Sequence, residues 1–134
     1  MIWLMIALGG AFGAVARFWL TRAISWRFSS TIGATLLANV VGSFMLGFVL
    51  IFAVQNTVLN IPQEWRVFVE IGFLGGFTTF ATFAVELRTM ILSSPMKALL
   101  YGAGMVVLSI FALIVGATLG NMWLANSSGI IPCG

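Results

Sequence analysis

The sequence predicts an all-α integral membrane protein, a bundle of four helices in a single domain. Of the 134 residues, 61% are hydrophobic and 7% are charged, which is too little polar surface to cover a water-soluble core. Four apolar stretches each approach the roughly 20 residues that a helix needs to span hydrocarbon. The connectors between them are short, so we expect one compact membrane domain over residues 1–134.

The first apolar stretch covers residues 2–20 and is interrupted only by Arg17. We expect Arg17 either to snorkel to the lipid headgroups or to make an electropositive vestibule. A cleaved signal peptide ending near Ala14 and Ala16 is the competing interpretation, but no basic residue precedes the apolar run. A retained membrane helix is therefore the favoured prediction.

The second stretch, residues 35–54, has no charge but carries a polar stripe. Thr35, Asn39 and Ser43 recur every fourth position and so share one helix face. The hydroxyls can bond carbonyls of their own helix. The Asn39 amide cannot satisfy itself locally, so it either joins two helices or faces a cavity.

The third stretch, residues 67–85, contains adjacent glycines near its middle. Gly75 and Gly76 each weaken a helix by about 1 kcal/mol relative to alanine. A break from Gly75 to Thr78 would free backbone carbonyls that can coordinate a cation. The equal alternative is an unbroken helix in which Gly72 and Gly76 let a neighbouring helix approach.

Two aromatic residues follow these glycines. Phe80 and Phe83 lie three positions apart and alternate with Thr79 and Thr82. Aromatic rings are electropositive at their edges, so two ring edges with nearby hydroxyl donors could attract a dehydrated anion without a fixed positive charge. Weak, multiple sites of this kind suit rapid conduction. Ordinary packing of two phenylalanines is the alternative interpretation.

The fourth stretch, residues 98–124, is uncharged and has Ser109 as its central polar residue. Ser109 either bonds its own helix or completes a polar track. Gly116 and Gly120 have the spacing that is typical of close helix packing.

The distribution of basic residues predicts the orientation in the membrane. Four spans place the first and third connectors on the side opposite both termini. Arg66 lies on the side of the termini, whereas more basic residues lie on the other side, which we expect to be cytoplasmic: Arg22, Arg27, Arg88 and Lys97. Because these charges lie beside helix ends, they suit anionic lipid headgroups and require no nucleic-acid partner.

Catalysis is the function that the residue content favours least. The chain has no histidine, and its lone Cys133 lies in the tail after Asn126, so no intramolecular disulfide can form. No carboxylate pair or nucleophile–base pair shares a helix face within a span. We therefore expect no enzyme activity.

Three segments together resemble the Fluc/CrcB family of fluoride channels. They are GGAFGAVAR at residues 9–17, GATLLANVVGSFMLGF at residues 33–48 and GFLGGFTTFATFAVE at residues 72–86. The resemblance implies a broken third helix and a dual-topology dimer of antiparallel subunits. It implies an anion pathway lined by Asn39, Ser43, Thr79, Phe80, Thr82, Phe83 and Ser109.

The resemblance also implies a cation site and two charged positions. A structural sodium ion would bind the backbone carbonyls of Gly75 and Thr78, while Arg17 and Glu86 would lie in the vestibules. Two departures stand out: Ala81 replaces a usual serine, and Met105 occupies a position that is often polar.

The implied function is passive export of fluoride across the inner, cytoplasmic membrane, which would protect the cell because fluoride enters as neutral acid and is trapped as anion. The expected partners are fluoride, sodium, the lipid bilayer and a second copy, although an oppositely oriented paralogue would also fit the charge bias. A small multidrug-resistance transporter needs a carboxylate deep in the first helix, which this chain lacks. A non-conducting membrane subunit is a further alternative.

Overall fold

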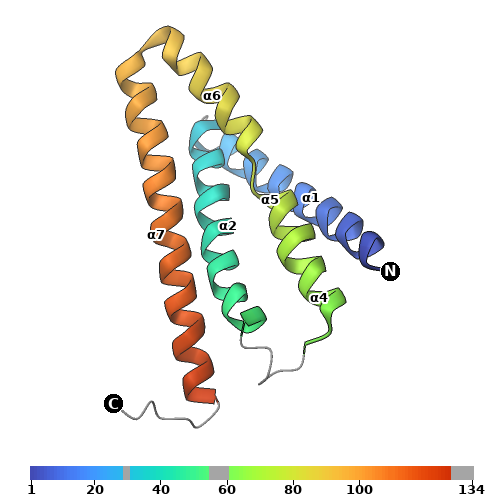
Figure 1. The fold of residues 1–134 in the computed structure, drawn as a ribbon. Helices are drawn as coiled ribbons and strands as arrows, with labels where there is room; N and C mark the ends of the chain where they lie inside the picture. The colour runs from blue at the N-terminus through green and yellow to red at the C-terminus, as the bar shows by residue number, and fades with distance from the viewer. Residues whose placement is uncertain (29–30, 55–60, 128–134) are drawn as a thin grey trace.

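The structure is a computed structural model that describes residues 1–28, 31–54 and 61–127 (Figure 1). Within these ranges the chain is helical apart from short turns, and four helical stretches are long and apolar enough to cross a membrane. They are Ile2–Arg27, Ile32–Phe52, Gln63–Ser93 and Pro95–Ser127. The all-α membrane fold predicted from composition is confirmed. Cys133 and most of the tail lie outside the described residues.

Helices α1 (Ile2–Phe28) and α2 (Thr31–Val54) form the first two spans. Helix α1 continues well past Leu20, where the apolar stretch ends, so residues 21–28 before the second stretch are also helical. The extension carries Arg22 and Arg27 on additional turns of helix. Hydropathy marks the part of a helix that lies in hydrocarbon, whereas backbone hydrogen bonding continues into the polar zone.

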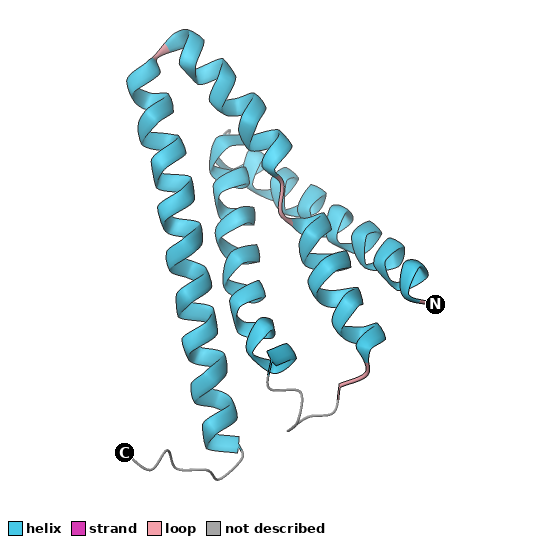
Figure 2. Ribbon diagram, viewed as in Figure 1, coloured by secondary structure: helices cyan, strands magenta, loops and turns pink. Residues whose placement is uncertain are grey.

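The third span consists of consecutive helical segments that begin after Pro62. Helix α4 (Gln63–Val67) leads into a π-helical segment, η1 (Phe68–Leu74), and then into the short α5 (Gly75–Phe77). Thr78 and Thr79 are extended, with φ/ψ of −78°/152° and −146°/111°, before α6 (Phe80–Ser93) begins. Figure 2 shows this loop between two helical parts of the span.

The helical interruption lies later than the glycines that were expected to cause it. Gly75 has helical φ/ψ of −63°/−36°, and Gly76 is also within α5. Gly76 packs so closely on α1 that a Cβ there would lie 3.0 Å from the Cα of Gly10. This close packing offsets the low helix propensity of glycine. The helical run ends instead at the extended Thr78, and Thr79 starts α6, because its side chain caps that helix by accepting from the Thr82 N–H.

Helix α7 (Pro95–Ser127) follows α6 after one extended residue, Ser94. The charged segment between the third and fourth apolar stretches, residues 86–97, is almost entirely helical, because both helices extend through most of it. Ser94 is extended, as residues before proline usually are. Pro95 then occupies the first helical position, where its missing N–H costs nothing.

Two helix pairs build the bundle. Helix α2 packs along α7, and α1 packs against η1 and α5, as Figure 1 shows. Both contacts depend on small residues: a Cβ on Gly72 would lie 2.9 Å from the Gly9 Cα, and one on Gly120 would lie 2.8 Å from the Phe48 carbonyl oxygen. The packing role predicted for the spaced glycines of both spans agrees with these contacts. The bundle places the interruption at Thr78 beside α2.

Candidate functional site

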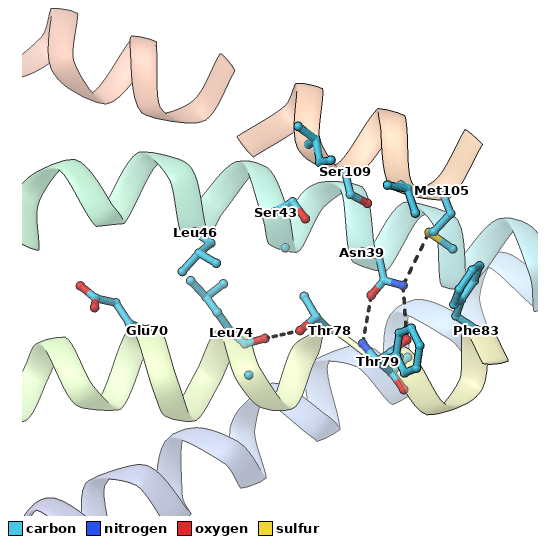
Figure 3. Close-up of a pocket in the computed structure, with 15 residues that line it drawn as sticks. Asn39, Ser43, Leu46, Glu70, Leu74, Thr78, Thr79, Phe83, Met105 and Ser109 are labelled. Carbon is cyan, nitrogen blue, oxygen red and sulfur yellow. Dashed lines mark hydrogen bonds between the residues drawn. The ribbon is translucent and has the colours of Figure 1, made fainter. Parts of the chain in front are cut away.

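A cavity of about 450 Å³ lies between α2, the third span and α7. Figure 3 shows side chains from all of these helices directed into it. Eight of the residues that the sequence singled out line this cavity: Asn39, Ser43, Gly75, Thr78, Thr79, Phe80, Phe83 and Ser109. Thr82, Arg17 and Glu86 line a second, smaller cavity instead.

The Asn39 side chain links α2 to the extended backbone of Thr79. Its Oδ1 accepts from the Thr79 N–H at 2.9 Å, and its Nδ2 donates to the Thr79 carbonyl at 3.3 Å. These are the bonds that an adjacent strand would make to an extended residue. Asn39 also donates to the Met105 sulfur at 3.6 Å (Figure 3), and a thioether is a weak acceptor. The amide therefore holds the interruption in place while it lines the cavity.

Thr79 has its side chain and its backbone in different roles. The Thr79 Oγ1 accepts from the Thr82 N–H at 3.3 Å and lies 3.1 Å from the Thr82 hydroxyl. This contact satisfies a donor at the first turn of α6 that no helical carbonyl can reach. Thr79 lines both cavities, so it lies at their common boundary.

The interruption leaves two backbone carbonyls without their usual helical donors. The Thr79 N–H, which would bond the Gly75 carbonyl in a continuous α-helix, bonds Asn39 instead. The Thr82 N–H, which would bond the Thr78 carbonyl, bonds the Thr79 hydroxyl. A Cβ on Gly75 would meet nothing within 4 Å, so open space adjoins this residue.

The two phenylalanines differ in their surroundings. The Phe83 side chain is 8% exposed, with its ring centroid 5.6 Å from that of Tyr101. Phe80 is 78% exposed, although its ring centroid lies 5.8 Å from that of Phe83 at an interplanar angle of 52°. Packing within the chain therefore accounts for Phe83 but leaves the position of Phe80 unexplained.

The serines of α2 and α7 complete the polar lining. Ser43 and Ser109 both line the cavity, and Figure 3 shows them above Leu46 and Asn39. The Ser109 Oγ is buried, and among the described residues it has no hydrogen-bond partner. Serine in a helix usually bonds a carbonyl of the preceding turn, so this hydroxyl is available to bond a group that enters the cavity.

The smaller cavity has a volume of about 230 Å³ and contains the predicted vestibule residues, Arg17 and Glu86. The Glu86 carboxylate accepts from the Thr35 hydroxyl at 2.8 Å and from the Tyr101 hydroxyl at 2.7 Å. These bonds tie α6 to α2 and α7. Glu86 is therefore held by hydroxyl donors inside the bundle and does not extend freely to the membrane surface.

Sequence reasoning missed the place of Glu70 in the larger cavity and the contact of Tyr101 with Glu86. Tyr101 was not singled out from the sequence, although Tyr101, Met105 and Ser109 follow the same four-residue spacing as the stripe on α2. Glu70, near the start of the third apolar stretch, was not singled out either, yet it lines the larger cavity. A carboxylate inside an apolar span was the available signal.

Comparison with known proteins gives one family. The family described as CrcB-like protein, Camphor Resistance (CrcB), matches residues 4–117. A protein of Thermosipho melanesiensis is 37% identical over 90% of this chain and 97% of its own length. A protein of Saccharophagus degradans is 40% identical over 89% of both chains. A protein of Tolumonas auensis is 37% identical over 87% of this chain and 88% of its own. Each of the three relatives is named fluoride-specific ion channel FluC.

Proposed function

The chain belongs to the CrcB-like protein family, and on that premise we propose that it is a channel that conducts fluoride passively through a membrane. The family membership confirms the resemblance predicted from the three sequence segments. The described residues contain four candidate membrane spans, so the chain is a multi-pass membrane protein. We place it in the inner, cytoplasmic membrane, where it would release fluoride that is trapped inside as the anion.

The observation that carries this proposal is the chemistry of the larger cavity. Its lining combines an amide, hydroxyls and two phenylalanine rings, and among the described lining residues no lysine or arginine is present. Amide and hydroxyl donors with ring edges can replace part of the hydration shell of a small anion. A fixed cation would hold the anion too strongly for rapid release. Weak neutral donors are therefore suited to conduction.

We propose a route that uses both cavities. Asn39, Ser43, Phe80, Phe83 and Ser109 would line its central part, the hydroxyls of Thr79 and Thr82 would connect it to the smaller cavity, and Arg17 and Glu86 would lie at that mouth. Arg17 would raise the local concentration of anions by its charge. The hydroxyls that bond Glu86 would keep its carboxylate away from the passing ion.

An antiparallel dimer is part of the proposal, with the third span acting as a broken helix at its centre. The single chain leaves Phe80 on its surface and open space beside Gly75. A second copy related by a twofold axis in the membrane plane would cover both and would give two equivalent routes. We take the homodimer as the primary form.

We also propose a structural sodium ion at the dimer centre. The Gly75 and Thr78 carbonyls fit a hard cation because the N–H groups that would bond them in a continuous helix bond the side chains of Asn39 and Thr79 instead. Each subunit would contribute both carbonyls. The bound ion would join the subunits and would not move with the anion. Sodium in place of a larger organic cation should then raise the thermal stability of the dimer, by about 2.7 kcal/mol at a hundredfold excess over its dissociation constant.

The test of the function is fluoride efflux from liposomes that contain only this purified chain. A fluoride electrode should record efflux when the membrane potential is released by an ionophore, and chloride loaded in the same vesicles should remain inside. Efflux of both anions at equal rates would contradict selectivity. Absence of fluoride efflux from vesicles that contain folded dimers would contradict the channel.

A further inference from the structure

Glu70 is the charged residue of the larger cavity that the proposed route does not use. Among the described residues that line this cavity, Glu70 alone carries a charge. Its side chain is 19% exposed, and its Oε1 is buried without a hydrogen-bond partner in the described part of the chain. A carboxylate in this state keeps most of its field, because neither water nor a donor surrounds the buried oxygen.

Arg66 compensates this charge only in part. It lies one helical turn before Glu70, and its Nε is 4.0 Å from the Glu70 Oε1. That distance is at the outer limit of an ion pair and too long for a hydrogen bond. The Arg66 Nε is itself buried without a hydrogen-bond partner among the described residues. The two charges therefore attract one another without being locked together.

Glu70 lies within the π-helical segment of the third span and lines one end of the larger cavity. Glu70 belongs to η1, whose wider turns shift the faces that follow it relative to an α-helix. In Figure 3 Glu70 lies at one end of the cavity, and Leu46 and Leu74 stand between it and Asn39. An anion at Asn39 or Ser43 would thus be separated from Glu70 by apolar side chains, which screen a charge poorly.

We propose that the Glu70–Arg66 pair sets the electrostatic potential of the larger cavity and so determines how readily an anion occupies it. This inference rests on the proposed channel function. Glu70 limits anion occupancy, and Arg66 offsets that effect, so the pair leaves a local net charge near zero. Both residues would act through their field, without contact with the ion.

Variants that change the charge of Glu70 or Arg66 should change the rate of fluoride efflux in opposite directions. Glu70→Gln leaves Arg66 uncompensated and should raise fluoride efflux at subsaturating fluoride by about three- to tenfold, whereas Arg66→Gln should lower it by a similar factor. The double variant has the same net charge as the parent and should return toward the parent rate. Glu64→Gln, on the exposed start of α4, and Arg88→Gln, exposed on α6, make the same charge changes outside both cavities and should leave the rate within about twofold.

The efflux rates of the variants relative to the parent test the proposal. A purely structural ion pair predicts that both single variants lose activity or stability together, so parallel losses, or no change in either, would overturn the proposal. If Glu70→Gln does not assemble, the comparison of Arg66→Gln with the charge-conserving Arg66→Lys takes its place. Equal efflux rates for these two Arg66 variants would also overturn the proposal. This test is distinct from the test of the channel function. A parent chain that fails to pass fluoride contradicts the channel function. A parent that conducts, with variants whose rates do not change as expected, contradicts only this inference.

Discussion

The Asn39 side chain joins α2 to the extended Thr79 backbone and also lines the larger cavity. Sequence reasoning held these two roles as alternatives, but the geometry contains both. The contact with the Met105 sulfur is the weakest of the three Asn39 hydrogen bonds. We infer that a fluoride ion would displace this contact, because an anion is the better acceptor.

Asn39→Asp tests both roles with almost no change in shape. The carboxylate cannot donate to the Thr79 carbonyl, and its charge repels an anion. We expect fluoride efflux to fall at least about a hundredfold, since an unsatisfied buried group costs about 1–3 kcal/mol and the repulsion adds to it. Asn121→Asp, near the exposed end of α7, is the matched control. Folded Asn39→Asp dimers that conduct at the parent rate would exclude Asn39 from the route.

Phe80 offers a test in which stability and function separate. Because its side chain is 78% exposed in the chain, Phe80→Ile should change the stability of the subunit by no more than about 0.5 kcal/mol. The substitution removes the electropositive ring edge, so we expect efflux to fall at least about tenfold. Phe111→Ile, on an exposed part of α7 away from the cavities, should conduct normally. Equal rates for the two variants would assign Phe80 to packing.

At the scale of the elements, glycine contacts determine how closely the helices approach. Gly47 and Gly116 each face a backbone carbonyl of the opposite helix, of Leu113 and Phe44 respectively. These contacts bring α2 and α7 together along their length and so place Ser43 and Ser109 at one cavity. Close packing here thus sets the width of the proposed route.

Two glycines of α7 form a matched pair for measuring this packing. Gly116→Ala places a Cβ against the Phe44 carbonyl, whereas Gly104→Ala meets nothing within 4 Å. We expect Gly116→Ala to destabilise the protein by about 1–3 kcal/mol. Gly104→Ala should be neutral or stabilising by up to about 1 kcal/mol, because alanine favours a helix. Thermal unfolding in detergent checks this, and equal effects at the two positions would show that the α2–α7 contact is looser than described.

At the scale of the whole molecule, the single chain leaves functional groups on its surface. Phe80 is exposed and Gly75 adjoins open space, although both line the larger cavity. In the proposed dimer, this open wall of the cavity would be covered from outside the chain. The covering partner that we propose is a second, antiparallel copy of the chain.

Cysteine crosslinking tests this assembly and its orientation together. In a Cys133→Ser background, Gly75→Cys lies near the proposed twofold axis and should form disulfide-linked dimers on oxidation. Leu92→Cys, exposed near the end of α6, should not, because antiparallel subunits place their copies of this position on opposite sides of the membrane. Crosslinking at Leu92 with none at Gly75 would indicate a parallel dimer.

The sequence alone was sufficient for the membrane fold class and for the family. Hydropathy and length identify spans because lipid cannot satisfy backbone hydrogen bonds, and this constraint is local to each helix. The four-residue spacing of Thr35, Asn39 and Ser43 likewise placed them on one face, and all three line a cavity. Helix ends were less predictable, because α1 and α6 continue through polar residues that hydropathy assigns to connectors.

Contacts between segments that are distant in the sequence decided the features that the sequence did not predict. The helical interruption lies at Thr78 and Thr79, not at Gly75 and Gly76, because the α1 packing keeps Gly76 helical while Asn39 supplies the hydrogen bonds of extended backbone. Glu70 lines the larger cavity from within η1, and no pattern in the sequence marks that π-helical segment. Local propensities differ by about 1 kcal/mol, so a few tertiary hydrogen bonds and close contacts are enough to override them.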